Sequence, residues 1–190
     1  MSKKKTLLLI AIIICLCFAV GGTLAYFSGS ETAHNVITTG NVSIVLKEQA
    51  RTENGLDDFT NPTGIMPGAE VSKIVTVEND GAAAAWIRVK VAKSVVLAEG
   101  KEGEIDLSLI TLDINTEDWT EQDGYYYYND PVLPYTATEP LFTTVSFDVG
   151  MGNLYQNSEA HIDVVAEAVQ VANNGTSALD ANGWPKKLEA

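Results

Sequence analysis

Two histidines are the side chains of this 190-residue sequence best suited to bind a metal ion. His34 and His161 lie far apart in the chain, and neither stands in an HExxH pattern. A zinc centre needs at least three protein ligands, so the fold would have to bring both histidines and a carboxylate together. Ordinary surface or strand histidines are the simpler interpretation. We therefore predict no metal ligand and no cofactor.

Nucleophilic catalysis finds no support in the residue pattern either. Cys15 and Cys17 both lie in an apolar N-terminal run, so removal of that run would leave no cysteine nucleophile and no disulfide. No GxSxG motif frames a serine, and no glycine-rich loop is present to hold a phosphate. We predict no catalytic residue and a protein that is not an enzyme.

Two further groups of residues suggest ligand binding. Asp113, Asn115 and Glu117 supply oxygen atoms at alternate positions, as at the start of a calcium loop, but Asp118 stands where such a loop needs glycine. Trp119 and the run Tyr125–Tyr128 could form a platform for sugars. Packing within a sheet is the alternative role for these aromatic rings, with two tyrosines facing in and two out.

The charge of the chain argues against anionic partners. The formal net charge is −13, and loss of the three N-terminal lysines Lys3, Lys4 and Lys5 would lower it to −16. Such a protein repels nucleic acid and anionic lipid. We therefore predict no nucleic-acid partner, and contact with a membrane only as a precursor.

The N-terminus has the layout of an export signal. A basic start, Met1–Lys5, precedes the apolar run Leu7–Val20, and Gly21-Gly22 then interrupts the helix. Small residues follow, which predicts a signal peptide over residues 1–25 and cleavage between Ala25 and Tyr26. An uncleaved membrane anchor is the alternative, because apolar character continues to Phe27. Cleavage would place the protein outside the cell, in an extracellular matrix or at the cell surface.

The remainder of the chain predicts an all-β fold. Apolar and polar residues alternate in several segments, and turn signals such as Pro67-Gly68 separate them. In the longest segment, Trp86, Arg88 and Lys90 lie on a face expected to be wetter. No βαβ pattern occurs, which favours an antiparallel sandwich over residues 41–172, with a loose tail over 173–190. The expected strands are Val42–Leu46, Glu70–Glu78, Ala84–Leu97, Tyr125–Tyr128, Leu141–Val149 and Ala160–Val171, with a short helical turn before a strand near Ile110.

Three segments carry a resemblance to a known family: GGTLAYFSGSETAHNVITTGNVSIVL, MPGAEVSKIVTVENDGAAAAWIRVKV and HIDVVAEAVQ. They resemble the TasA/camelysin proteins of Gram-positive bacteria. In that family a SipW-type signal peptidase cuts within a GGT-x-A-x-F sequence, and a T-x-G-x-hydrophobic strand start follows. The matching residues are Gly21, Gly22, Thr23, Ala25, Phe27, Thr38, Gly40 and Val42.

The resemblance implies a jelly-roll sandwich and, for the family's fibre-forming members, a way to assemble. The processed N-terminal segment of one subunit inserts as a β-strand into the next, so the partners are further copies or related matrix subunits. Here the donor segment would be residues 26–40, with Tyr26, Phe27, Val36 and Ile37 as apolar anchors.

Alternatives to the secreted biofilm-matrix fibre subunit stay open. Residues Tyr26–Thr39 could pair within their own subunit. The family also includes camelysin, described as a metalloprotease, so a camelysin-like cell-surface metalloprotease is one rival function. A monomeric surface adhesin or binding module, using exposed Trp119 and Tyr125–Tyr128, is another.

The cleavage site gives the first testable prediction. The secreted protein should begin at Tyr26, because the small residues before it suit a signal peptidase. Mass spectrometry of the intact secreted chain measures this directly. A chain that keeps Met1 and stays with the membrane fraction would favour the anchor instead.

Overall fold

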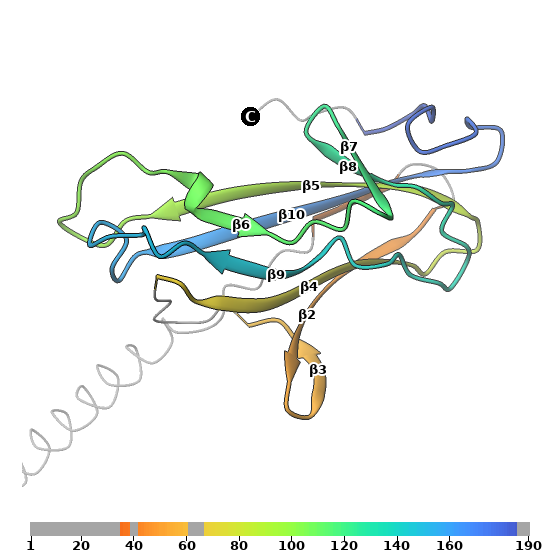
Figure 1. Cartoon of the computed structure of the whole chain (residues 1–190). Coiled ribbons are helices and arrows are strands. Elements are labelled where there is room, and N and C mark those ends of the chain that lie inside the picture. The colour runs from red at the N-terminus through yellow and green to blue at the C-terminus, as the bar shows by residue number, and fades with distance from the viewer. Residues whose placement is uncertain (1–34, 39–41, 61–66, 186–190) are drawn as a thin grey trace, which may run out of the picture. The chain divides into compact units, whose positions relative to one another are not determined.

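The structure is a computed structural model, and it describes residues 35–38, 42–60 and 67–185. Two five-stranded sheets face each other as a sandwich (Figure 1). Sheet A has the order β1-β10-β5-β8-β7, and sheet B has the order β3-β2-β4-β9-β6. The elements are β1 Asn35–Thr38, β2 Ile44–Thr52, β3 Gly55–Asp58, β4 Glu70–Asn79, β5 Ala85–Val96, the 3-10 helix η1 Leu107–Leu109, β6 Ile110–Leu112, β7 Trp119–Gln122, β8 Tyr125–Tyr128, β9 Phe142–Phe147 and β10 Glu159–Gln170.

Apolar side chains from the inner faces of both sheets form the main core. The predicted alternation is confirmed in β2, where Ile44 and Leu46 are buried, and in β5, where Ile87 and Val89 are fully buried. Burying a side chain of this size contributes about 1.5–3 kcal/mol. Further core members are Val42, Val75, Val77, Ala85, Ile110, Trp119, Val132, Leu141, Phe142, Val145, Phe147, Met151, Val164, Ala166 and Ala168.

The longest ladder joins β5 to β10 in sheet A. These antiparallel strands pair over their whole lengths, from Glu159 opposite Val96 to Gln170 opposite Ala85. All other neighbours in the two sheets are also antiparallel except β1 and β10, which are parallel. The predicted antiparallel sandwich is therefore confirmed.

A second, smaller core covers the outer face of sheet A. Its members are Trp86, Tyr125, Tyr127, Val169, Ala178 and Ala181, with Val171 and Trp184 packed against them. The loose tail predicted from Asn173 is thus wrong for residues 173–185, which lie against this face. Trp86 helps to hold the segment by donating its Nε1–H to the carbonyl of Asn174 at 2.8 Å.

A buried ion pair lies between the outer face and this C-terminal segment. Glu167 Oε2 is 2.6 Å from both Nε and Nη2 of Arg88, and Arg88 Nη1 donates to the Tyr127 hydroxyl at 3.2 Å. The guanidinium lies 4.0 Å from the ring centre of Tyr125 and 4.6 Å from that of Trp184. The face expected to be wetter is therefore covered, because Arg88 finds both a counter-ion and aromatic rings there.

A second buried ion pair lies in sheet B. Lys73 Nζ is 2.7 Å from Glu48 Oε1, and both side chains are only 4 % exposed. The ring of Phe59 lies over the ammonium at 4.2 Å from its centroid. The β4–β9 register shifts between Ser72 and Val75, so Lys73 lies within a bulge.

Three short elements differ from or refine the prediction. β3 and β7 lie outside the expected strands. β3 is exposed throughout and β7 is exposed after buried Trp119, so main-chain pairing to a neighbour and not alternation defines them. The helical turn expected before Ile110 is confirmed as η1. Lys93 fixes this turn by donating to the carbonyls of Leu107 and Ile110 at 3.0 and 2.6 Å.

The predicted signal peptide, the cleavage site at Ala25 and Tyr26, and the anchor Phe27 lie outside the described residues. Among the residues that the structure does describe, no helix is long and apolar enough to cross a membrane.

Removal of one partner from the Arg88–Glu167 pair should be costly. We expect Glu167→Ala to lower the free energy of unfolding by about 3 kcal/mol, because it leaves a buried guanidinium without its counter-ion. Urea denaturation measures the change. The control is Glu159→Ala on the same strand, whose side chain is 76 % exposed. Equal effects of the two substitutions would contradict this account of the pair.

Candidate functional site at the β1–β10 edge

The candidate metal ligands do not assemble a zinc centre in the described part of the chain. His161 lies on β10 with its side chain 40 % exposed, and its Nε2 is 3.6 Å from Glu159 Oε2. His34 lies outside the described residues. No group of three or more histidine, cysteine, aspartate or glutamate side chains occurs where the structure was searched. The described residues therefore do not fit the ligand set of a zinc peptidase.

The suspected calcium loop has a structural role instead. The Asp113 carboxylate accepts the N–H groups of Thr143 and Thr144 at 2.8 and 2.7 Å and the Thr143 hydroxyl at 2.6 Å. The side-chain oxygen of Asn115 accepts the N–H of Glu117 at 3.2 Å. Burial on its own raises the pKa of Asp113, but the hydrogen bonds from Thr143 and Thr144 hold that pKa below its ordinary value of 3.8.

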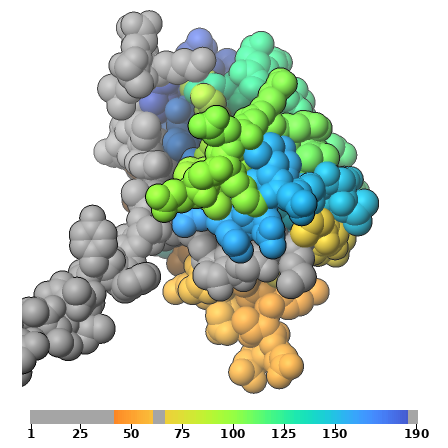
Figure 2. Space-filling view, turned by 90° about the vertical axis from the view of Figure 1, so that its left-hand side faces the viewer, coloured from red at the N-terminus to blue at the C-terminus, as the bar shows by residue number. Residues whose placement is uncertain are grey.

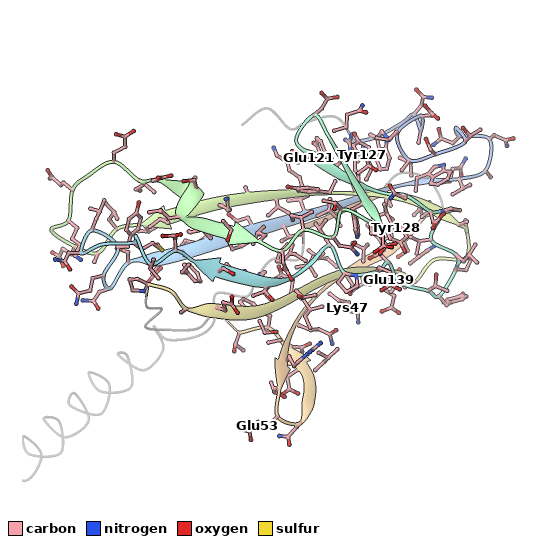
Figure 3. The ribbon with its side chains drawn as sticks, in the orientation of Figure 1. Lys47, Glu53, Glu121, Tyr127, Tyr128 and Glu139 are labelled. Atoms are coloured by element: carbon pink, nitrogen blue, oxygen red, sulfur yellow. The ribbon has the colours of Figure 1, made fainter. Side chains whose placement is uncertain are left out.

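The aromatic platform is not formed. Trp119 is 1 % exposed, packs 5.0 Å from the ring of Tyr128, and donates its Nε1–H to the carbonyl of Glu139 at 3.2 Å. Figure 3 labels Tyr128 and Glu139. Tyr125 and Tyr127 are buried in the outer cluster, whereas Tyr126 and Tyr128 pack against the main core. The alternation of the tyrosines is confirmed. The idea of an exposed Trp119 that carries adhesin binding is wrong.

The β1–β10 edge of sheet A is the feature best suited to bind another chain. β1 pairs in parallel with β10 from Asn35 opposite Val165 to Thr38 opposite Ala168. β10 runs from Glu159 to Gln170, so β1 covers only part of its outer side. In the described part of the chain, no strand pairs with that side of Glu159–Val164.

The register at this edge places β1 beside buried positions of β10. Val36 lies opposite Ala166, which is fully buried, and Ile37 lies opposite Glu167 of the ion pair. The backbone of both predicted anchors thus pairs within the chain itself, and their side chains lie outside the description. A strand edge that no described strand covers presents main-chain N–H and C=O groups, so this edge can take up an extended peptide.

The sequence signals for this site were uneven. The family resemblance implied a donor strand that includes Val36 and Ile37, but the parallel direction and the register with β10 had no signal in the residues. The triple hydrogen bonding of Asp113 was also missed, because Thr143 and Thr144 are far from it in sequence.

Comparison with models of protein families identifies a relationship. Residues 1–110 match the family model described as camelysin metallo-endopeptidase. This stretch is more than half of the chain and extends to the start of β6. Comparison with curated proteins gave no match, and comparison with solved structures also gave none.

Asp113 should make the free energy of unfolding of the domain depend on pH in the acid range. Because its folded-state pKa is lowered, its contribution is present above its ordinary pKa of 3.8 and is lost as the pH falls through the folded value. We expect Asp113→Asn to reduce the free energy of unfolding by about 1 kcal/mol at neutral pH. Urea denaturation at neutral pH and near pH 3 should show the difference shrinking in acid.

The matched control for this prediction is Asp58→Asn, on the exposed strand β3. It should change little at either pH. A difference between the Asp113→Asn variant and the wild type that stays constant from neutral pH to acid would contradict the role given to the Asp113 carboxylate.

Proposed function

The chain belongs to the camelysin metallo-endopeptidase family, and within it we propose that the protein is a secreted structural subunit of extracellular biofilm-matrix fibres. Subunits assemble by donation of the N-terminal segment, residues 26–40, to the next copy or to a related matrix subunit. The observation that carries the proposal is the short parallel strand β1 at the partly covered edge of β10.

The pairing of β1 suits exchange between copies. Four residue pairs hold it to β10, whereas β5 holds the other side of β10 along its whole length. A short edge strand opens at a lower free energy than a central one. The equivalent strand of a second copy can form the same main-chain hydrogen bonds, so exchange changes the partner and keeps the bonds.

The part of β10 with which no described strand pairs offers additional main-chain hydrogen bonds to an incoming strand. If the register of Asn35 with Val165 continues, residues 29–34 of a donor run beside Glu159–Val164. Tyr26 and Phe27 then lie just beyond the start of β10 and act as apolar anchors. Each main-chain hydrogen bond formed there contributes about 0.5–1.5 kcal/mol.

Processing sets the time of assembly in this proposal. A donor segment joined to an uncleaved signal stays at the membrane, so a SipW-type signal peptidase that cuts between Ala25 and Tyr26 releases it. The mature charge of −16 keeps subunits apart at low ionic strength. Salt or mild acid weakens this repulsion and favours association.

Electron microscopy of the chain cut to begin at Tyr26 tests the proposal. We expect filaments from this chain and folded monomers from a matched chain that begins at Asn41. Protein that stays monomeric at high concentration, through acidification and changes of salt, would remove the fibre function. An unfolded Asn41 chain would instead show that the segment belongs to its own core.

A single substitution in β1 should weaken assembly. Val36→Asp places a charge beside fully buried Ala166 of the accepting strand, and we expect the critical concentration for filaments to rise by about tenfold or more. Sedimentation of filaments at a series of protein concentrations measures it. Asn35→Asp is the charge-matched control, because its partner Val165 is only half-buried.

The family description favours metallo-endopeptidase activity as a second candidate function. Metal analysis of the purified protein, together with casein hydrolysis with and without a chelator, separates the two. Stoichiometric zinc and chelator-sensitive cleavage that His34→Ala or His161→Ala abolishes would overturn the purely structural assignment.

A further inference from the structure

Three Asn-Gly dipeptides occur among the described residues: Asn54-Gly55, Asn174-Gly175 and Asn182-Gly183. Asparagine before glycine is the pair most open to attack on the side chain by the following backbone nitrogen, because glycine carries no side chain to hinder it. We propose that Asn54 is a site of spontaneous modification to aspartate and isoaspartate, and that the fold protects the other two asparagines.

The reaction needs only water. The backbone nitrogen of Gly55 attacks Cγ of Asn54 and loses its proton, a C–N bond forms, and the Cγ–Nδ2 bond breaks. The amide nitrogen leaves as ammonia with that proton, and a cyclic imide remains. Water then opens the imide at one of its two carbonyls. One opening gives aspartate, and the other gives isoaspartate with an extra methylene in the main chain.

Few contacts of Asn54 hinder this reaction. It lies at the tip of the β2–β3 hairpin, next to Glu53, and the hairpin projects from the sandwich (Figures 1, 2 and 3). In the described part of the chain its side-chain amide makes no hydrogen bond, and only its backbone N–H donates, to Thr52 Oγ1 at 3.3 Å. Apart from Gly55 itself and the two residues adjoining it, no described heavy atom lies within 4 Å of where a side chain on Gly55 would begin.

The strand beyond the tip can also open. All four residues of β3, Gly55–Asp58, are exposed, and β3 is an edge strand that pairs with β2 alone in sheet B. Exposed edge segments with few packed neighbours open at a small free-energy cost. Gly55 pairs with Thr52 and its carbonyl accepts the Thr52 hydroxyl at 3.2 Å, so opening of this last pair of the hairpin lets Gly55 reach the geometry that attack on Asn54 requires.

Asn174 is held by hydrogen bonds on both sides of its side-chain amide. Its Nδ2 donates to the carbonyls of Gln170 and Asn182 at 3.1 and 2.9 Å, and its Oδ1 accepts the N–H of Asn182 at 2.7 Å. Its own carbonyl accepts the Nε1–H of Trp86. Attack by Gly175 would have to break this network before Cγ could turn toward it.

Asn182 is protected through the same network. Its backbone N–H and carbonyl are both bonded to the side chain of Asn174, and its Nδ2 lies 3.4 Å from the carbonyl of Asp180. The side-chain hydrogen bond of Asn182 is longer, and therefore weaker, than those of Asn174. We therefore expect Asn182 to react more slowly than Asn54 and faster than Asn174. The modification at Asn54 adds a negative charge beside Glu53, in a hairpin that already carries Asp57 and Asp58.

Peptide mapping by mass spectrometry tests the inference. The folded secreted chain is kept at mildly alkaline pH, and conversion is followed at each dipeptide over time. We expect conversion at Asn54 to be at least about tenfold faster than at Asn174, because several hydrogen bonds must open at Asn174. An isoaspartyl methyltransferase, used as the probe for isoaspartate, should label the Asn54 peptide first.

Two controls separate the role of the fold from that of the dipeptide. In the urea-unfolded chain the three sites should convert at similar rates. In the unfolded chain Gly55→Ala should slow conversion at Asn54, because the methyl group hinders the attacking nitrogen; in the fold, where Gly55 has a φ of +125°, alanine would strain the hairpin instead. The inference fails if Asn54 is stable in the folded chain while it reacts in the unfolded chain, or if Asn174 converts as fast as Asn54 does in the folded protein.

Discussion

The ladder between β5 and β10 is the constraint on which the other parts of this molecule depend. It runs the full length of both strands, from Glu159 opposite Val96 to Gln170 opposite Ala85. Its inner face carries much of the apolar core, and its outer face carries the second cluster under the C-terminal segment. The same ladder leaves one side of β10 for β1, which, among the described residues, pairs with Val165–Ala168. The β1–β10 edge proposed to accept a donor strand therefore arises because β10 is long and its described neighbour β1 is short.

The inner half of this sandwich was predictable from the sequence because alternation with period two records burial on one face. Ile87 and Val89 of β5 and Ile44 and Leu46 of β2 followed that rule. The outer half was not predictable, because Arg88 suggests water unless Glu167 and the aromatic rings are known to meet it. Those partners come from β10, β8 and the C-terminal segment, and no local pattern joins them. Polar edge strands such as β3 are also hard to predict from the sequence, because main-chain hydrogen bonds to a neighbouring strand form them and no alternation of apolar residues marks them.

The candidate site was predictable in position and not in geometry. The resemblance to a family implied a strand that includes Val36, whereas the parallel pairing with Val165–Ala168 depends on where a strand more than a hundred residues away lies. The sequence was less informative about the residues considered for cation or sugar binding, because a residue type does not reveal its contacts in the fold. Asp113 could hold a cation by composition, yet in the fold Thr143 and Thr144 occupy its oxygens. Trp119 could stack on a ligand, yet it lies in the core.

The two buried ion pairs disfavour incorrect pairing registers of the strands that carry them. Strands rich in valine and alanine, such as β5 and β10, offer many nearly equivalent pairings, and a slip by one residue moves each side chain to the opposite face. A slip of β10 against β5 would carry Glu167 away from Arg88 and leave a lone charge in an apolar interior, which is strongly unfavourable. Lys73 and Glu48 impose the same condition on β2 and β4. The described residues contain no cysteine, so no disulfide among them fixes the alignment, and these charges favour the correct strand register.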